Sequence, residues 1–158
     1  MLRYIQKRIT FEEIPTEVCL SLSISGCQNR CQGCHSPELR LEQGTEITDV
    51  EIQRLLTHNE GVSCVLFLGE GRDPERLKEL ARLVNDAGLK VALYSGRNAV
   101  EEDIWQVFDY IKIGEYDSRF GALNVPTTNQ RLYQKVKPRQ YATKLGVIWN
   151  DITARLWR

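Results

Sequence analysis

The chain has 158 residues, with 21 Lys and Arg against 21 Asp and Glu, and 42% of its residues are hydrophobic. This length supports one hydrophobic core without disulfide bonds. No apolar run approaches the ~20 residues that a membrane-spanning helix needs, and the N-terminus has no apolar stretch of the kind found in secretory signals. We therefore expect a single cytoplasmic domain over residues 1–158, without a membrane partner.

The cysteine count and the charge distribution narrow the class further. Five cysteines are an odd number, which suits thiols or metal ligands in a reducing compartment better than a disulfide framework. Residues 119–158 contain eight basic residues and one acidic residue, although the whole chain is neutral. No run of five or six like charges occurs there, so we interpret this basic C-terminal segment as a solvated surface and do not expect nucleic acid as a partner.

Four short apolar runs predict β-strands, each closed by or leading into glycine. They occupy residues 19–25, 63–68, 90–94 and 110–113. Cys19 and Cys64 lie within two of these runs, where cysteine commonly serves as a small core residue.

Between these runs, apolar residues with helical spacing predict three helices, over residues 48–57, 74–87 and 99–107. The first stretch begins with a capping box formed by Thr48 and Glu51. The second begins with Asp73 as N-cap and Pro74 at the first helical position, and it stops at Gly88. Alternation of strands and helices is typical of parallel strands joined by right-handed crossovers.

The resulting fold prediction is an α/β architecture. A complete (β/α) barrel takes ~250 residues, so this chain can supply about half of one. We predict a partial (β/α) barrel of parallel strands with its core over residues 19–132, and an open doubly wound sheet is the alternative. In both architectures the functional groups lie on loops at the carboxyl ends of the strands.

The loop after the first of these strands contains three cysteines, Cys27, Cys31 and Cys34. Thiolates this close together are typical of a metal site. A zinc site would need a fourth ligand, for which His35 or His58 is available. A C-x-x-C redox pair would leave Cys27 without a role. Three thiolates could also hold an iron–sulfur cluster, with one iron left open to another ligand.

The C-x3-C-x2-C spacing on the loop after the first strand resembles the signature of the radical S-adenosylmethionine (SAM) superfamily. The resemblance implies a [4Fe–4S] cluster held by Cys27, Cys31 and Cys34, whose open iron binds the amino and carboxyl groups of SAM. The turn Gly69-Glu70-Gly71 is similar to the superfamily's Gly-Gly-Glu-Pro motif, but it lacks the first glycine and the proline. The implied SAM contacts are Gly33, Cys34, His35, Gly69, Glu70, Ser95 and Lys112.

Two later segments narrow the resemblance to the activases of the anaerobic ribonucleoside-triphosphate reductase. Residues 109–117 resemble their Asp-x-Leu-Val-Asp-Gly-x-Phe segment, with Lys112 and Ile113 in place of Val-Asp. Residues 127–132, which include Asn129, Gln130 and Arg131, resemble Ser-Ser-Asn-Gln-Arg. Asn129 and Gln130 could equally be loop residues with a structural role.

The activase resemblance implies an enzyme, a radical SAM oxidoreductase. It would cleave SAM reductively and generate a glycyl radical on the class III reductase, with electrons from a flavodoxin-like protein. The alternatives are a small-molecule radical SAM enzyme, such as a deazaguanine synthase, and a zinc-stabilised interaction module.

Overall fold

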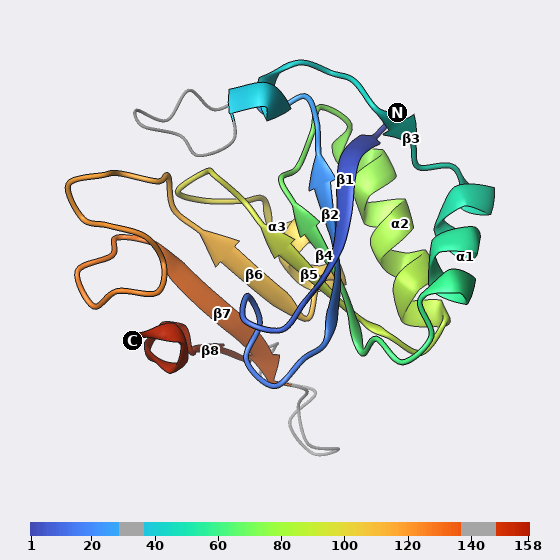
Figure 1. The fold of residues 1–158 in the computed structure, drawn as a ribbon. Helices are drawn as coiled ribbons and strands as arrows, with labels where there is room; N and C mark the ends of the chain where they lie inside the picture. The colour runs from blue at the N-terminus through green and yellow to red at the C-terminus, as the bar shows by residue number, and fades with distance from the viewer. Residues whose placement is uncertain (29–36, 137–147) are drawn as a thin grey trace.

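The computed structural model describes residues 1–28, 37–136 and 148–158 of the chain. Within these residues eight strands form one sheet in the order β3-β1-β2-β4-β5-β6-β7-β8 (Figure 1). The strands are β1 (Arg3–Thr10), β2 (Cys19–Ile24), β3 (Thr45–Glu46), β4 (Cys64–Leu68), β5 (Lys90–Tyr94), β6 (Tyr110–Ile113), β7 (Arg131–Val136) and β8 (Ile148–Asp151). The helices are η1 (Pro37–Arg40), α1 (Asp49–His58), α2 (Pro74–Asp86), α3 (Glu102–Val107) and η2 (Thr153–Leu156).

The predicted partial barrel of parallel strands is wrong. The four predicted strands, β2, β4, β5 and β6, do pair in parallel. Antiparallel strands flank them on both sides, however, so that four of the seven pairings in the described sheet are antiparallel. The reason lies in the connections. A parallel return needs a crossover, usually a helix, and the described residues between β6 and β7 contain turns and an isolated bridge without a helix.

The two longer predicted helices are confirmed, together with their caps. The Thr48 hydroxyl accepts the Glu51 N–H at 3.0 Å and begins α1. The Asp73 carboxylate accepts the Arg76 N–H at 3.1 Å and begins α2. Among the described residues the longest helix has 13 residues, and none combines the length and apolar character needed to cross a bilayer.

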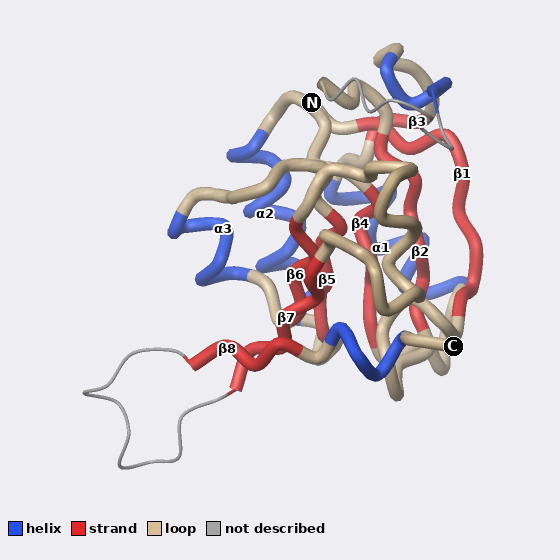
Figure 2. The backbone as a smooth tube through the Cα atoms, turned by 90° about the vertical axis from the view of Figure 1, so that its left-hand side faces the viewer, coloured by secondary structure: helices blue, strands red, loops and turns tan. Residues whose placement is uncertain are grey.

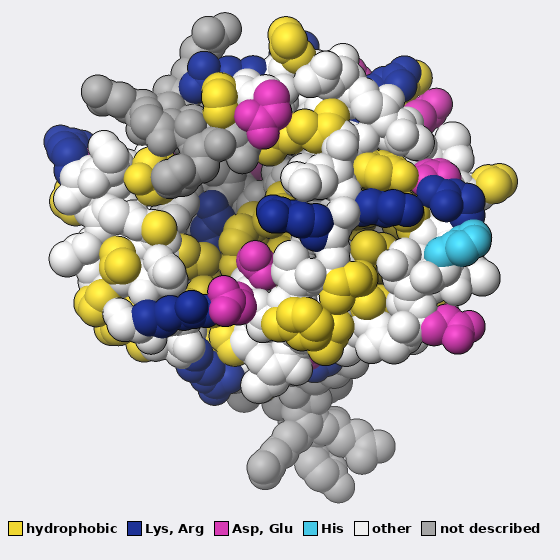
Figure 3. All heavy atoms as spheres, viewed as in Figure 1, with side chains coloured by type: hydrophobic (Ala, Val, Ile, Leu, Met, Phe, Trp, Pro, Cys, Tyr) yellow, Lys and Arg dark blue, Asp and Glu magenta, His cyan; other side chains and the backbone are white. Residues whose placement is uncertain are grey.

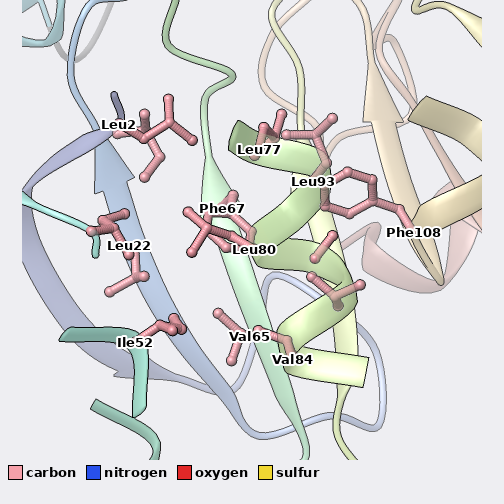
Figure 4. Close-up of a cluster of buried hydrophobic side chains, with 14 of the residues drawn as sticks. Leu2, Leu22, Ile52, Val65, Phe67, Leu77, Leu80, Val84, Leu93 and Phe108 are labelled. Atoms are coloured by element: carbon pink, nitrogen blue, oxygen red, sulfur yellow. The ribbon is translucent and has the colours of Figure 1, made fainter. Parts of the chain in front are cut away.

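The three α-helices pack on one side of the sheet, which we call the helix face (Figure 2). Alternate strand residues such as Leu22, Phe67 and Leu93 point toward α2 and meet Leu80 and Val84 there (Figure 4). All five side chains have no solvent exposure. Burial of this kind contributes roughly 25 cal/mol per Å² of apolar surface, so this face supplies most of the hydrophobic stabilisation.

The opposite side of the sheet, the loop face, carries a smaller apolar cluster that includes Cys19, Cys64 and Tyr110. Ile14, which precedes β2, and Ile152, which follows β8, pack into this cluster. Cys19 and Cys64 are neighbours in the β2–β4 register and are 1% and 0% exposed, which confirms their prediction as core residues. A hydrogen bond with Cys19, together with burial, raises the pKa of the Cys64 thiol far above its ordinary value.

Aromatic side chains join the last strands to α3. The Trp105 ring lies 4.7 Å from that of Trp149 and 5.7 Å from that of Tyr133, measured between ring centroids, and both contacts are edge-on. These contacts tie β7 and β8 to the helix face.

Candidate functional site

The carboxyl ends of the four central strands meet at one rim of the sheet, because these strands run parallel. Cys27 follows β2, Gly69 and Glu70 follow β4, and Ser95 follows β5. Lys112 is the third of the four residues of β6. The structure therefore brings these predicted site residues to the same rim. Four other predicted residues, Cys31, Gly33, Cys34 and His35, lie outside the described residues.

Two clefts open at this rim, and both are lined by Cys27 and Gly69. The helix-side cleft has a volume of about 440 Å³ and is also lined by Glu70, Arg72 and Arg97. The loop-side cleft has a volume of about 270 Å³, and its other lining residues include Gln6, Arg8, Ser23, Leu68 and Tyr94. Cys27 is partly exposed, so its thiol stands where the two clefts approach one another.

Hydrogen bonds hold the two described ends of the cysteine loop in place. The Cys27 N–H donates to the Leu39 carbonyl at 2.7 Å. The Arg72 guanidinium donates from Nε to the Gly26 carbonyl at 3.3 Å and from Nη2 to the Arg40 carbonyl at 3.4 Å. Arg72 thus links the residue before Cys27 to the far end of the loop. Sequence reasoning missed it, because no local pattern connects Arg72 to positions 26 and 40.

Gly69 requires the conformational freedom of glycine. Its φ angle is +109°, a region that other residues rarely adopt, and its N–H donates to the Tyr94 carbonyl at 2.9 Å. A Cβ at this position would lie 3.4 Å from the Ile24 carbonyl oxygen. Glycine is therefore favoured here by the turn after β4, which packs against the end of β2.

The Glu70 carboxylate is hydrogen-bonded to two neighbouring residues on the rim. Its carboxylate accepts the Ser95 hydroxyl at 2.5 Å and two Arg97 hydrogen bonds at 2.9 and 2.6 Å. Arg97 also binds Glu101 at 2.8 and 2.7 Å, and these hydrogen bonds lower the pKa of Glu101 to about 2. Ser95 and Glu70 were predicted as separate SAM contacts. The structure joins them by a direct hydrogen bond, and Arg97, for which the sequence predicted no role, binds both of them.

Lys112 lies on the loop face and is 7% exposed. Its ammonium group sits 5.4 Å from the centre of the Tyr94 ring and donates to the Gly114 carbonyl at 3.4 Å. A cation over an aromatic face is stabilised by the ring quadrupole. Lys112 therefore places a buried positive charge behind Tyr94, one of the walls of the loop-side cleft.

Asn129 and Gln130 have structural contacts in the described chain. Gln130 Nε2 donates to the Gly114 carbonyl at 3.1 Å, and Asn129 Nδ2 donates to the Glu115 carbonyl at 3.0 Å. Gly114 packs against Gln130 so closely that a Cβ would lie 2.9 Å from the Gln130 Cα. These contacts hold the segment after β6 against the start of β7.

Among the described residues, no group of three His, Cys, Asp or Glu side chains is arranged to hold a metal ion. Comparisons with models of protein families, with curated proteins and with solved structures each returned no match. Functional inference therefore depends on the residues of this rim and on the spacing of the cysteines.

Proposed function

We propose that the protein is a radical SAM activase, which binds a [4Fe–4S] cluster and SAM at this rim and generates a glycyl radical on the anaerobic ribonucleoside-triphosphate reductase. One observation carries the proposal. Cys27, the first cysteine of the C-x3-C-x2-C spacing, comes three residues after the end of β2, which pairs in parallel with β4, and it lines two clefts together with Gly69. A reactive group in an α/β sheet is expected at such a carboxyl edge.

The described residues fit these cofactors in two respects. Thiolates are the usual protein ligands of iron–sulfur clusters, and the Cys27 thiol is partly exposed at the cleft walls. The loop-side cleft combines apolar Leu68 and Tyr94 with polar Ser23 and Gln6, a lining typical of small-molecule sites. When bound, the cofactors supply one-electron cleavage of the SAM sulfonium and abstraction of a hydrogen atom from a glycine.

Each rim residue then has a definite task. Cys27, with Cys31 and Cys34, would hold iron. The backbone at Gly69, which lines both clefts, would lie against the methionine part of SAM. Glu70 accepts hydrogen bonds from the Arg97 side chain and Ser95 accepts the Arg97 N–H at the helix-side cleft, and so their role is to fix the shape of the rim. Lys112 would favour an anionic group near Tyr94.

The loop face supports a protein as substrate in preference to a metabolite. Among the described residues the α-helices pack on the other face, and the loop-side cleft is left beside the β1 edge of the sheet. A large partner could cover this cleft and exclude water from it. A small molecule would leave the cleft exposed to solvent.

The test is anaerobic reconstitution with iron and sulfide, followed by SAM and a reductant. We expect about four iron atoms per chain, formation of 5′-deoxyadenosine, and a glycine-centred doublet in the electron paramagnetic resonance spectrum once the class III reductase is added. Cys27→Ala, Cys31→Ala and Cys34→Ala should each lose iron and SAM cleavage. Cys64→Ala is the matched control, because Cys64 is buried in β4, and it should retain both.

Other results would overturn the proposal. A colourless protein that keeps zinc through purification would indicate the zinc-stabilised module. SAM cleavage without the glycine doublet would indicate a small-molecule substrate.

A further inference from the structure

The outer edge of β1 is open over most of its length. β3 pairs with β1 only at Arg3 and Tyr4, and from Ile5 to Thr10 the strand has β2 on one side and no strand of the described chain on the other. In Figure 1, β1 passes in front of the other strands with its lower half uncovered. A strand edge presents backbone N–H and C=O groups that can pair with another extended chain.

Two adjacent cations mark this edge. Lys7 and Arg8 are both exposed, and neither side chain makes a hydrogen bond or an ion pair with the part of the chain that the structure describes. Figure 3 shows a row of Lys and Arg side chains crossing this face of the molecule over β1. Successive strand residues point to opposite faces, so Lys7 and Arg8 place positive charge on both sides of the strand.

Apolar surface continues the edge at its carboxyl end. Ile9 is 42% exposed and Phe11 is 68% exposed, and both are among the large hydrophobic side chains that solvent reaches. Ile9 and Phe11 therefore add apolar contact surface beside the two cations.

The edge also adjoins the candidate site. Gln6 and Arg8 of β1 line the loop-side cleft, whose walls include Cys27 and Gly69. An extended chain added to β1 would therefore run along the mouth of this cleft.

We infer that the outer edge of β1 from Ile5 to Thr10 is a docking site for an extended acidic segment of a partner protein, which adds to the sheet as a further strand. Because Lys7 and Arg8 point to opposite faces, the segment needs two consecutive acidic residues, flanked by an apolar residue that meets Ile9. That the partner is the substrate reductase rests on the function proposed above; the docking surface itself does not depend on it.

The probe is a fluorescein-labelled, capped octapeptide of Val and Thr with two adjacent Asp residues at its centre. Its binding to the full-length chain is measured by fluorescence anisotropy at low salt. We expect saturable binding, and the charge reversal Lys7→Glu with Arg8→Glu should weaken it by about tenfold or more. Arg82→Glu is the matched control: Arg82 is exposed on α2 and also lacks an ion pair with the described chain, so binding should not change.

Two altered peptides separate strand addition from simple charge attraction. Moving one Asp by a single residue places both carboxylates on the same face and should weaken binding. N-methylation of alternate residues removes the N–H groups along one edge of the peptide; methylation of one set should abolish binding, whereas methylation of the other set should have no effect. Equal binding of all these peptides, or no binding of the parent peptide, would overturn the docking site.

A competition experiment tests the link to the substrate. The parent peptide should inhibit glycyl radical formation on the reductase, raising the KM for the reductase without changing kcat. Binding without inhibition would disprove that the reductase docks here. Because peptide binding needs neither iron nor SAM, a chain that binds the peptide but forms no cluster would refute the proposed function alone.

Discussion

The two faces of the sheet are built from the same strands but differ in chemistry. On the helix face, residues such as Leu22, Phe67 and Leu93 form a continuous apolar core under the helices. On the loop face, Lys112 of β6 and Glu17, which lies just before β2, are buried and charged beside a small apolar cluster. Strand alternation assigns successive residues to opposite faces, so one short strand can serve stability and chemistry at once.

This difference separates two kinds of stabilisation. The helix face depends on packing, where the loss of atoms leaves a cavity. The loop face depends on satisfied polar groups, where the loss of one partner leaves another partner buried without a hydrogen bond. Substitutions on the two faces should therefore change the free energy of unfolding by different amounts, and these changes should depend differently on pH.

The largest effect is expected on the helix face, from Phe67→Ala. Phe67 is fully buried and meets Phe108 edge-on, with ring centroids 6.3 Å apart. The substitution should lower the free energy of unfolding by about 3–5 kcal/mol, measured by urea denaturation with far-UV circular dichroism. Phe11→Ala, at a side chain that is 68% exposed, should change it by no more than about 0.5 kcal/mol. Similar losses in the two variants would contradict the packing of this face.

A smaller effect is expected on the loop face, from Glu17→Gln. The Glu17 carboxylate accepts hydrogen bonds from Ser63 at 2.5 Å, Lys90 at 2.9 Å and Tyr110 at 3.0 Å. Lys90 is 52% exposed and can turn to solvent, so we expect a loss of about 1.5–3 kcal/mol in the free energy of unfolding. Glu12→Gln, at an exposed carboxylate, is the control. If Glu17→Gln lowered the free energy of unfolding no more than the control, the hydrogen bonds of Glu17 would not stabilise the fold.

The pH dependence should distinguish this network from packing. Burial acts to raise the pKa of Glu17, but the hydrogen bonds from Lys90, Ser63 and Tyr110 hold it below its ordinary value of 4.5. The ionised carboxylate therefore stabilises the folded state above pH 4.5, and this contribution is lost as the pH falls through the lower folded-state pKa. The difference between wild type and Glu17→Gln should shrink in acid, whereas that for Phe67→Ala should stay nearly constant.

The smallest effect is expected at the rim, from Ser95→Ala. Ser95 is fully buried, donates to Glu70 and accepts the Arg97 N–H at 3.1 Å. Arg97 still holds Glu70 by two hydrogen bonds in this variant, so the loss should be about 1 kcal/mol in the free energy of unfolding. A loss as large as that of Phe67→Ala would mean that the rim is part of the core.

The sequence predicted the interior of the fold better than its borders. The four central strands are buried on both faces and therefore appear as continuous apolar runs. The edge strands carry no such run: residues 6–9 of β1 are all exposed, and β7 and β8 mix polar with aromatic residues. For this reason the antiparallel strands were missed and the barrel prediction was wrong.

The candidate site shows the same division. The positions of Cys27, Gly69 and Ser95 after strand ends could be predicted, since local glycine and polar patterns mark them. The contacts of Arg97 with Glu70 and of Arg72 with Gly26 join positions 27 and 46 residues apart. Such contacts depend on the packed sheet and leave no local signal.

The aromatic contacts between α3 and β8 have a consequence for spectroscopy. All three tryptophans of the chain, Trp105, Trp149 and Trp157, lie after the central strands β2, β4 and β5, and the close edge-on rings of Trp105 and Trp149 favour exciton coupling in the near-ultraviolet. The Trp105–Trp149 pair therefore reports on one border of the sheet, where α3 meets β8. Trp157 lies instead beside Arg158, whose guanidinium pairs with Glu12 just beyond the end of β1.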